Sequence, residues 1–177
     1  MLVQQSPAFL SWFGESQVVD AAARPRIVYH GTAVSGTTFD APPGALPRGA
    51  FTVFDREYLG AVTESSDSRV GFWFTADKDR AWAAAQEAKA CGHGDSAYVY
   101  AVFLRIRRPL VTRRIRALSP AQVARLAKYA RAEGHDGLIF TWGEGVGSDF
   151  LVFEPTQIKS AVANLGLFDP DNPCICA

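Results

Sequence analysis

The residues best suited to chemistry begin at Arg26, where an apolar run leads directly into His30, Gly31 and Thr32. This pattern predicts a buried strand over residues 27–30 whose end carries the polar residues into a cleft. A neutral histidine can hydrogen-bond a ribose hydroxyl, and a glycine lets a ligand approach the backbone closely. A structural histidine before a turn gives the same pattern, so the motif alone leaves both interpretations open.

A second candidate is the aromatic stretch Gly71-Phe72-Trp73-Phe74. Aromatic rings can stack on a nicotinamide or adenine ring, although a plain core strand has the same composition. Because side chains alternate along a strand, Phe72 and Phe74 are predicted to share one face, with Trp73 on the other.

The third candidate is Asp149, at the start of the apolar stretch 150–153. A carboxylate at a cleft rim can hold a ribose hydroxyl and stabilise positive charge at an anomeric carbon. An ordinary loop aspartate is the competing interpretation. Glu144, in the glycine-rich loop 143–147, and Glu154, before a proline, are less favourably placed carboxylates.

The elements that must position these residues follow from periodicity and from turn residues. Helices are expected over residues 8–13, from Asp79 to Ala90 and from Ser119-Pro120 to Gly134. Strands are expected over residues 27–30, 70–75, 98–106, 138–141, 150–153 and 158–161. Strands outnumber helices and the crossovers are irregular, which predicts an α+β fold with a mixed or antiparallel sheet.

Composition sets the class of protein. A chain of 177 residues with 48% hydrophobic residues suits one cored domain, with residues 1–24 as a docking arm and 167–177 as an irregular tail. A formal net charge of zero provides no global field for nucleic acid or membranes. The sequence shows no signal peptide and no membrane-length apolar run. With three cysteines, an odd number, it predicts a cytoplasmic protein.

Two further clusters have open or disfavoured roles. The arginines at 105, 107, 108, 113, 114 and 116 indicate either a solvated edge or a phosphate-contacting patch. The pairs Cys91/His93 and Cys174/Cys176 lack the ligand spacing of structural zinc sites, so no metal is expected.

Taken in order, His-Gly-Thr after a strand, Gly-aromatic-aromatic-Phe before a helix, and Asp-Phe-Leu-Val-Phe near the C-terminus resemble the H-Y-E ADP-ribosyltransferases, the diphtheria-toxin and PARP group. Further stretches resemble the ADP-ribosyltransferase-like domain of phage polyvalent proteins and related bacterial effectors, over nearly the whole chain. They are residues 9–16, 18–20, 29–32, 134–139, 153–161 and 164–169.

The resemblance implies a split, two-sheet NAD-binding fold with catalytic residues His30, Trp73 and Asp149. His30 would bond the adenosine-side ribose, and the Gly31 backbone the nicotinamide carboxamide. Trp73 falls where the family has its stacking tyrosine, and Asp149 where it has its catalytic glutamate. The NAD-contacting set implied is Tyr29, His30, Gly31, Thr32, Phe72, Trp73, Phe74 and Trp82.

The implied activity is NAD-dependent mono-ADP-ribosyl transfer by a monomer to a macromolecule, with protein favoured over nucleic acid as acceptor. An NAD glycohydrolase and a weakly active NAD- or ADP-ribose-binding module are the alternatives. The shorter Asp149 carboxylate and the bulkier Trp73 motivate the second, since a misplacement of about 1 Å can cost on the order of a hundredfold in rate. Arginine-modifying relatives carry an acid where this chain has Gly147, which disfavours arginine as acceptor.

Overall fold

The computed structural model describes residues 3–113, 118–142 and 148–177. The helices are α1 (Pro7–Phe13), α2 (Lys78–Ala90) and α3 (Pro120–Ala132), with short 3-10 turns at Val3–Gln5, Arg56–Tyr58 and Pro155–Gln157. The strands are β1 (Val28–Val34), β2 (Phe72–Thr75), β3 (Ser96–Leu104), β4 (Pro109–Thr112), β5 (Gly137–Thr141), β6 (Ser148–Val152) and β7 (Ile158–Ser160).

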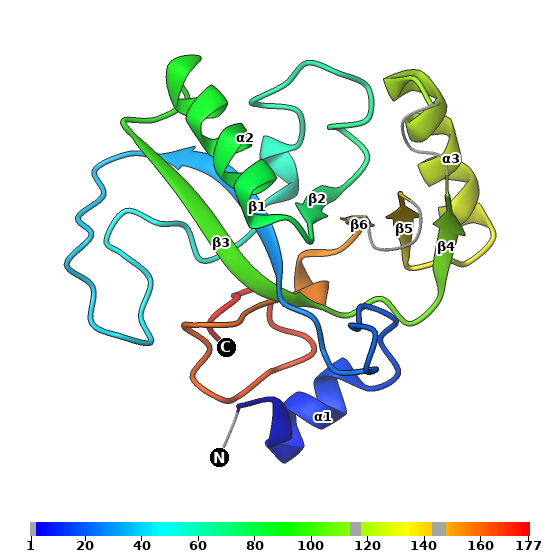
Figure 1. Ribbon diagram of the computed structural model, residues 1–177, viewed down its shortest axis with the longest axis horizontal. Helices are drawn as coiled ribbons and strands as arrows, with labels where there is room; N and C mark the ends of the chain where they lie inside the picture. Colours follow the sequence, from blue (N-terminus) through cyan, green and yellow to red (C-terminus); the bar gives the residue numbers. More distant parts are fainter. Residues whose placement is uncertain (1–2, 114–117, 143–147) are drawn as a thin grey trace.

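These strands form one curled, mixed sheet in the order β4-β5-β6-β2-β1-β3-β7. Only β4 and β5 are parallel, and the other neighbouring pairs are antiparallel. In Figure 1, α2 and α3 lie above the strands, while α1 and the C-terminal tail lie below them. The predicted α+β class with a mixed sheet is therefore confirmed.

The sheet is nearly divided between β1 and β2. β1 pairs with β3 along its whole length, and β2 pairs with β6 along its whole length. Between β1 and β2 the only registered pair is Tyr29 with Thr75. Two well-paired halves, β4-β5-β6-β2 and β1-β3-β7, are thus joined by a single residue pair, which is the split that the family resemblance implied.

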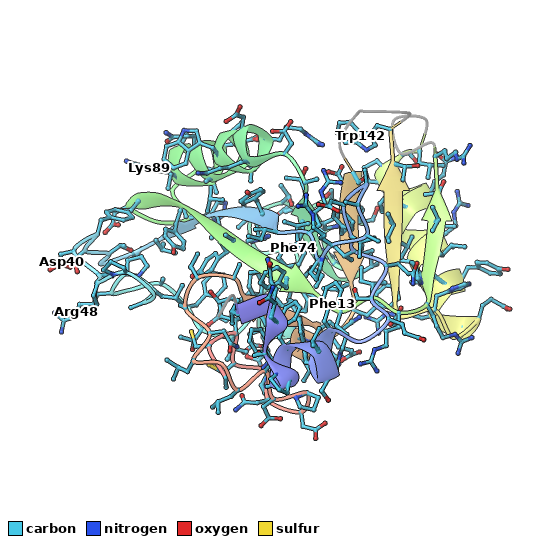
Figure 2. All side chains as sticks on the ribbon, turned by 60° about the horizontal axis from the view of Figure 1, so that its bottom comes forward. Phe13, Asp40, Arg48, Phe74, Lys89 and Trp142 are labelled. Atoms are coloured by element: carbon cyan, nitrogen blue, oxygen red, sulfur yellow. The ribbon has the colours of Figure 1, made fainter. Side chains whose placement is uncertain are left out.

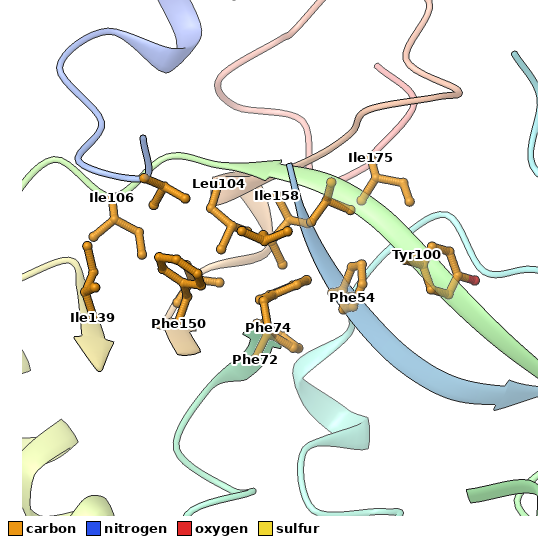
Figure 3. Close-up of a cluster of buried hydrophobic side chains, with 14 residues drawn as sticks. Phe54, Phe72, Phe74, Tyr100, Leu104, Ile106, Ile139, Phe150, Ile158 and Ile175 are labelled. Atoms are coloured by element: carbon orange, nitrogen blue, oxygen red, sulfur yellow. The ribbon is translucent and has the colours of Figure 1, made fainter. Parts of the chain in front are cut away.

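Three apolar clusters hold the described residues together. The largest, shown in part in Figure 3, gathers Phe54, Phe72, Phe74, Tyr100, Leu104, Ile106, Ile139, Phe150, Ile158 and Ile175 with smaller residues. A second packs α3 against Leu138, Phe140 and Leu151. Burying a side chain of this size stabilises the fold by about 1.5–3 kcal/mol.

The third cluster docks the N-terminal arm. Phe9, Trp12 and Phe13 of α1 pack on Phe103 of β3 and on Phe168 of the tail. The rings of Phe9 and Phe168 meet edge to face, with centroids 5.0 Å apart. The tail has no regular secondary structure, as expected, but its Phe168 and Ile175 side chains are buried.

Several predicted boundaries need correction. β1 continues to Val34, so His30 is the third residue of a strand and not its last. The strand β4 is missing from the predicted strands, because a proline at the start of a short apolar run argues against a strand. Pro109 instead begins β4, which is an edge strand, and such a position tolerates the missing N–H. The predicted loop 143–147 lies outside the described residues.

Helix α2 begins where the sequence predicted. The Asp77 side chain accepts hydrogen bonds from the backbone of Asp79 and Arg80. Ala81, Ala85 and Ala88 form its buried face, as expected, but Trp82 is 48% exposed. Helical periodicity alone groups Trp82 with these alanines in one apolar stripe, but the helix buries only the narrower alanine face against the sheet.

No helix in the described ranges is both long enough and apolar enough to cross a membrane. Over the same ranges, no three His, Cys, Asp or Glu side chains gather as metal ligands would.

Candidate functional site

Asp149 lies where the two halves of the sheet meet. It is the second residue of β6 and pairs with Thr75 on one side and Phe140 on the other. Thr75 is itself the residue that joins β2 to Tyr29 of β1. The Asp149 residue is only 6% exposed, so a charged group is held at the seam of the sheet.

Arg80 is the ion-pair partner of this carboxylate. Its Nη1 lies 3.0 Å from Oδ1 of Asp149, and its guanidinium carbon lies 3.9 Å from the ring centroid of Trp142. Figure 2 shows Trp142 at the end of the molecule away from Phe13 of α1. The Arg80 side chain is 45% exposed, so solvent weakens the pair, and its role is to orient the carboxylate more than to stabilise the fold.

The pKa of Asp149 reflects two opposing effects. Burial disfavours the charged carboxylate and raises the pKa above the 3.8 of an ordinary aspartate. The charge of Arg80 and the hydroxyl of Thr75 lower it, but burial outweighs them. The site therefore holds a carboxylate that is more basic than usual.

His30 spans the split. Its Nδ1 lies 2.8 Å from the backbone oxygen of Trp73, and a carbonyl can only accept, so Nδ1 carries the proton. The imidazole thus links β1 to β2 just beyond the point where their ladder ends. Nε2 is left with a lone pair that can accept a hydrogen bond from a ligand hydroxyl.

The surroundings of His30 keep it neutral. Its ring packs against Phe54 and Phe74, with centroids at 5.1 Å and 5.5 Å. Burial lowers the pKa of His30 below 6.5, and the hydrogen bond to the Trp73 carbonyl only partly offsets this. The sequence-based expectation of a neutral histidine agrees with this environment.

The register places Trp73 and Asp149 on one face of the sheet and His30 on the other. Trp73 stacks on Phe140, the direct neighbour of Asp149, with centroids 5.3 Å apart. His30 packs instead on Phe74, which belongs to the opposite core cluster. The structure therefore brings Trp73 close to Asp149. His30 lies on the opposite face of the sheet from both residues, next to the split between β1 and β2.

A model of the family described as ADP-ribosyltransferase in polyvalent proteins matches residues 20–168. The chain belongs to this family. No curated protein and no solved structure matches it. The matched span of this ADP-ribosyltransferase domain contains all seven strands, the split and the Asp149 seam.

The remaining predicted residues of the ADP-ribosyltransferase domain lie on both sides of the split. Phe72 and Phe74 are 6% and 2% exposed in the core, opposite to Trp73 as predicted, so they support the site from within. Tyr29 pairs with Thr75 and so forms the β1 side of the residue pair that joins β1 to β2. Thr32 is buried, and its hydroxyl makes only a long bond of 3.5 Å to the Ala33 carbonyl.

Gly31 lets α2 approach the sheet. A Cβ built on Gly31 would lie 1.7 Å from the backbone oxygen of Ala81, so only glycine fits there. The contact fixes α2, and with it Arg80, over the seam that Asp149 occupies. The Gly31 role suggested by the resemblance, binding a carboxamide, remains a prediction.

Sequence reasoning missed Arg80 and Trp142. One signal was present: Lys78 and Arg80 lie in the first turn of α2, where a positive charge opposes the helix dipole. A basic residue there needs an acidic partner to offset the dipole. The first turn directly follows β2, which pairs with β6, so Asp149 was a nearby candidate partner.

A cavity of about 540 Å³ lies elsewhere, at the far end of β6, and it is lined by Arg105, Arg107, Arg131, His135, Asp136, Phe153, Glu154, Thr156 and Gln157. Asp149 and Glu154 are separated by five residues, about 16 Å of extended chain. We place the candidate active site at Asp149 rather than in this cavity, because the cavity contains none of the residues that the family resemblance implicates.

Proposed function

We propose that this domain is an NAD-dependent mono-ADP-ribosyltransferase that modifies a macromolecular acceptor, with protein favoured. The observation that supports the proposal best is the nearly buried carboxylate of Asp149 at the junction of the two half-sheets. Membership of the ADP-ribosyltransferase family supports the reaction type.

In the proposed reaction, the bond between the ribose anomeric carbon and the nicotinamide nitrogen breaks. Its electron pair leaves with nicotinamide, and positive charge develops on the ribose ring. Asp149 accepts a hydrogen bond from the ribose 2′-hydroxyl and stabilises this charge, which a buried carboxylate does better than an exposed one. The acceptor's nucleophile then bonds to the anomeric carbon and releases its proton to solvent.

In this proposal NAD lies across the split between β1 and β2, and His30, on the other face of the sheet from Asp149, contributes binding rather than proton transfer. Because its Nδ1 proton is held by the Trp73 carbonyl, Nε2 is oriented as an acceptor for a hydroxyl of the adenosine-side ribose. Its lowered pKa keeps this lone pair available at neutral pH. Trp82 offers an exposed ring for stacking on the nicotinamide, in line with its predicted place among the NAD contacts.

A second candidate, a module that binds NAD with little turnover, is favoured by the Arg80 contact. A guanidinium nitrogen 3.0 Å from Asp149 cancels part of the charge that the transition state requires. Two proteins would show this same Arg80–Asp149 contact. One is an active enzyme in which Arg80 moves away from Asp149 when NAD binds, and the other is an inactive NAD-binding module. Only a rate measurement separates them.

The deciding experiment incubates the purified chain with NAD labelled in the adenosine moiety, with and without a cell lysate. Released nicotinamide and labelled macromolecules are both measured. Transfer predicts nicotinamide release together with label on protein, and both signals should be lost in Asp149→Asn and His30→Ala. The exposed Asp95→Asn serves as the matched control, and it should behave like the unmodified chain.

Three other outcomes would contradict the proposal. Free ADP-ribose without labelled macromolecules would indicate an NAD glycohydrolase. A rise in melting temperature with NAD and no nicotinamide would indicate the binding module. If NAD at millimolar concentration gives no nicotinamide release and no thermal shift, all three functions are excluded.

A further inference from the structure

The arginine-rich cavity at the far end of β6 is a second candidate site, separate from the seam at Asp149. Its basic residues come from three parts of the chain: Arg105 and Arg107 after β3, Arg131 at the end of α3, and His135 before β5. Arg107 donates to the carbonyls of Ser11 and Trp12, so the cavity lies beside α1. The lining of the cavity includes neither Asp149 nor its partner Arg80, so the two sites share no residue of this ion pair.

The acidic residues of this cavity are already engaged. Asp136 accepts hydrogen bonds of 2.8 Å from the backbone N–H groups of Arg107 and Arg108. Glu154 is paired with Arg56 and also lies 3.8 Å from Arg131. Both carboxylates therefore have partners other than the guanidinium groups of Arg105 and Arg107.

Arg105 and Arg107 lack a carboxylate partner. Within the described part of the chain, neither guanidinium lies within 4.0 Å of a carboxylate oxygen. The two positive groups also repel each other: burial and the charge of Arg107 both lower the pKa of Arg105, and the charges of Asp171 and Asp136 only partly offset this. An anion bound between them would relieve this repulsion.

Hydrogen bonds to backbone carbonyls hold both arginine side chains in place. Arg105 donates through Nη2 to the Pro170 carbonyl at 3.3 Å, and Arg107 donates through Nη2 to the Trp12 carbonyl at 3.0 Å. A guanidinium has five N–H donors, so each arginine keeps others for a ligand. The Gln157 side chain, which also lines the cavity, donates hydrogen bonds to the backbone carbonyls of Arg105 and Asp136 and so holds these two segments together.

The charge and size of the cavity select the ligand. A carboxylate brings one negative charge, whereas a phosphomonoester brings nearly two and has three acceptor oxygens for two guanidinium groups. A volume of about 540 Å³ falls in the range of small-molecule sites and exceeds the needs of a bare phosphate ion. We infer that Arg105 and Arg107, with His135 at the edge, form a binding site for a phosphomonoester.

The phosphomonoester could be carried by a free metabolite or by the 5′ end of a nucleic-acid strand. The inference does not depend on the proposed function, and its test uses no NAD. Inorganic phosphate is titrated into the ¹⁵N-labelled chain while the arginine Nε–H resonances are followed by NMR. Those of Arg105 and Arg107 should shift and saturate, while that of Arg113, in the same basic segment but outside the cavity, should not.

The sources are separated with matched ligands. Glucose 6-phosphate is compared with glucose, and a 5′-phosphorylated oligonucleotide with its 5′-hydroxyl form. Whichever phosphorylated ligand binds more tightly identifies the source. Arg105→Gln should weaken phosphate binding about tenfold or more, because it removes one charge-assisted contact, and Arg113→Gln should not.

Three results would overturn the inference. One is the absence of saturable shifts at Arg105 and Arg107 in the unmodified chain, a measurement that does not depend on any variant folding. A second is equal loss of binding in Arg105→Gln and Arg113→Gln, since that indicates general electrostatic attraction. The third is equal affinity for each phosphorylated ligand and its unphosphorylated form.

Discussion

Arg80 and Asp149 form an ion pair of 3.0 Å across the seam where the two halves of the sheet meet. The arginine comes from the first turn of α2 and the aspartate from the start of β6. The pair couples the position of α2 to the charge of the proposed catalytic carboxylate.

Replacing Arg80 by Gln should move the acidic limb of the pH–rate profile upward. If Asp149 acts as proposed, nicotinamide release requires its ionised form, and the rate falls as the pH drops through the pKa of this residue. Burial raises that pKa above 3.8 and Arg80 lowers it, so removing Arg80 raises it further. The measurement is the initial rate of nicotinamide release against pH.

Lys78→Gln is the matched control for this experiment, because it removes the same charge from the same helical turn. Lys78 lies outside the ion pairs found in the described ranges. An acidic limb that stays in place in Arg80→Gln, or that moves equally in both variants, would contradict the assigned role of Arg80.

Asp149→Glu should raise the rate of nicotinamide release. The resemblance places Asp149 where the family has a glutamate, and the added methylene would carry the carboxylate farther from the seam. If the shorter side chain limits the rate, the gain should be on the order of ten- to a hundredfold. Asp95→Glu, on the exposed surface, controls for added bulk, and an unchanged or reduced rate in Asp149→Glu would show that the aspartate is already well placed.

Trp73→Phe should destabilise the fold modestly. The substitution keeps an aromatic ring against Phe140 but removes the indole N–H, which donates to the Asp67 carbonyl at 2.9 Å. A single hydrogen bond of this kind is worth about 1 kcal/mol. Urea denaturation measures the change, and a loss well above this value would mean that the packing of the ring matters more than its hydrogen bond.

Gly31→Ala should displace α2. The new methyl group would lie 1.7 Å from the Ala81 oxygen and 2.9 Å from the Ala85 nitrogen, both backbone atoms that cannot rotate away. We expect a loss of about 3 kcal/mol, at the upper end of the usual cost of overpacking, together with a weaker Arg80 contact. Thermal unfolding gives the change in stability, and the pH–rate profile reports on the contact.

Gly36→Ala is the comparison for this substitution. Its φ of +66° disfavours alanine by about 1–2 kcal/mol, but the added Cβ meets no atom within 4 Å. If both variants lose the same stability, close approach of α2 is not what requires glycine at position 31.

Periodicity and capping residues were sufficient for much of the fold. The alternation at 72–74 correctly placed Phe72 and Phe74 opposite Trp73, because strand geometry is local. Ser119 and Pro120 correctly located the start of α3, since an N-cap acts within one turn. The parallel partner of β5, strand β4, was not predicted, because Pro109 at its start is a residue that usually ends a strand.

The sequence by itself determined most of the elements, the family and the candidate residues His30, Trp73 and Asp149, because these depend on residue type and local spacing. Only the tertiary structure decided that Trp73 and Asp149 share a face from which His30 is separated, and that Arg80 pairs with Asp149. Strand register and helix docking set those relationships. Both arise from contacts between residues far apart in the chain, which no local pattern encodes.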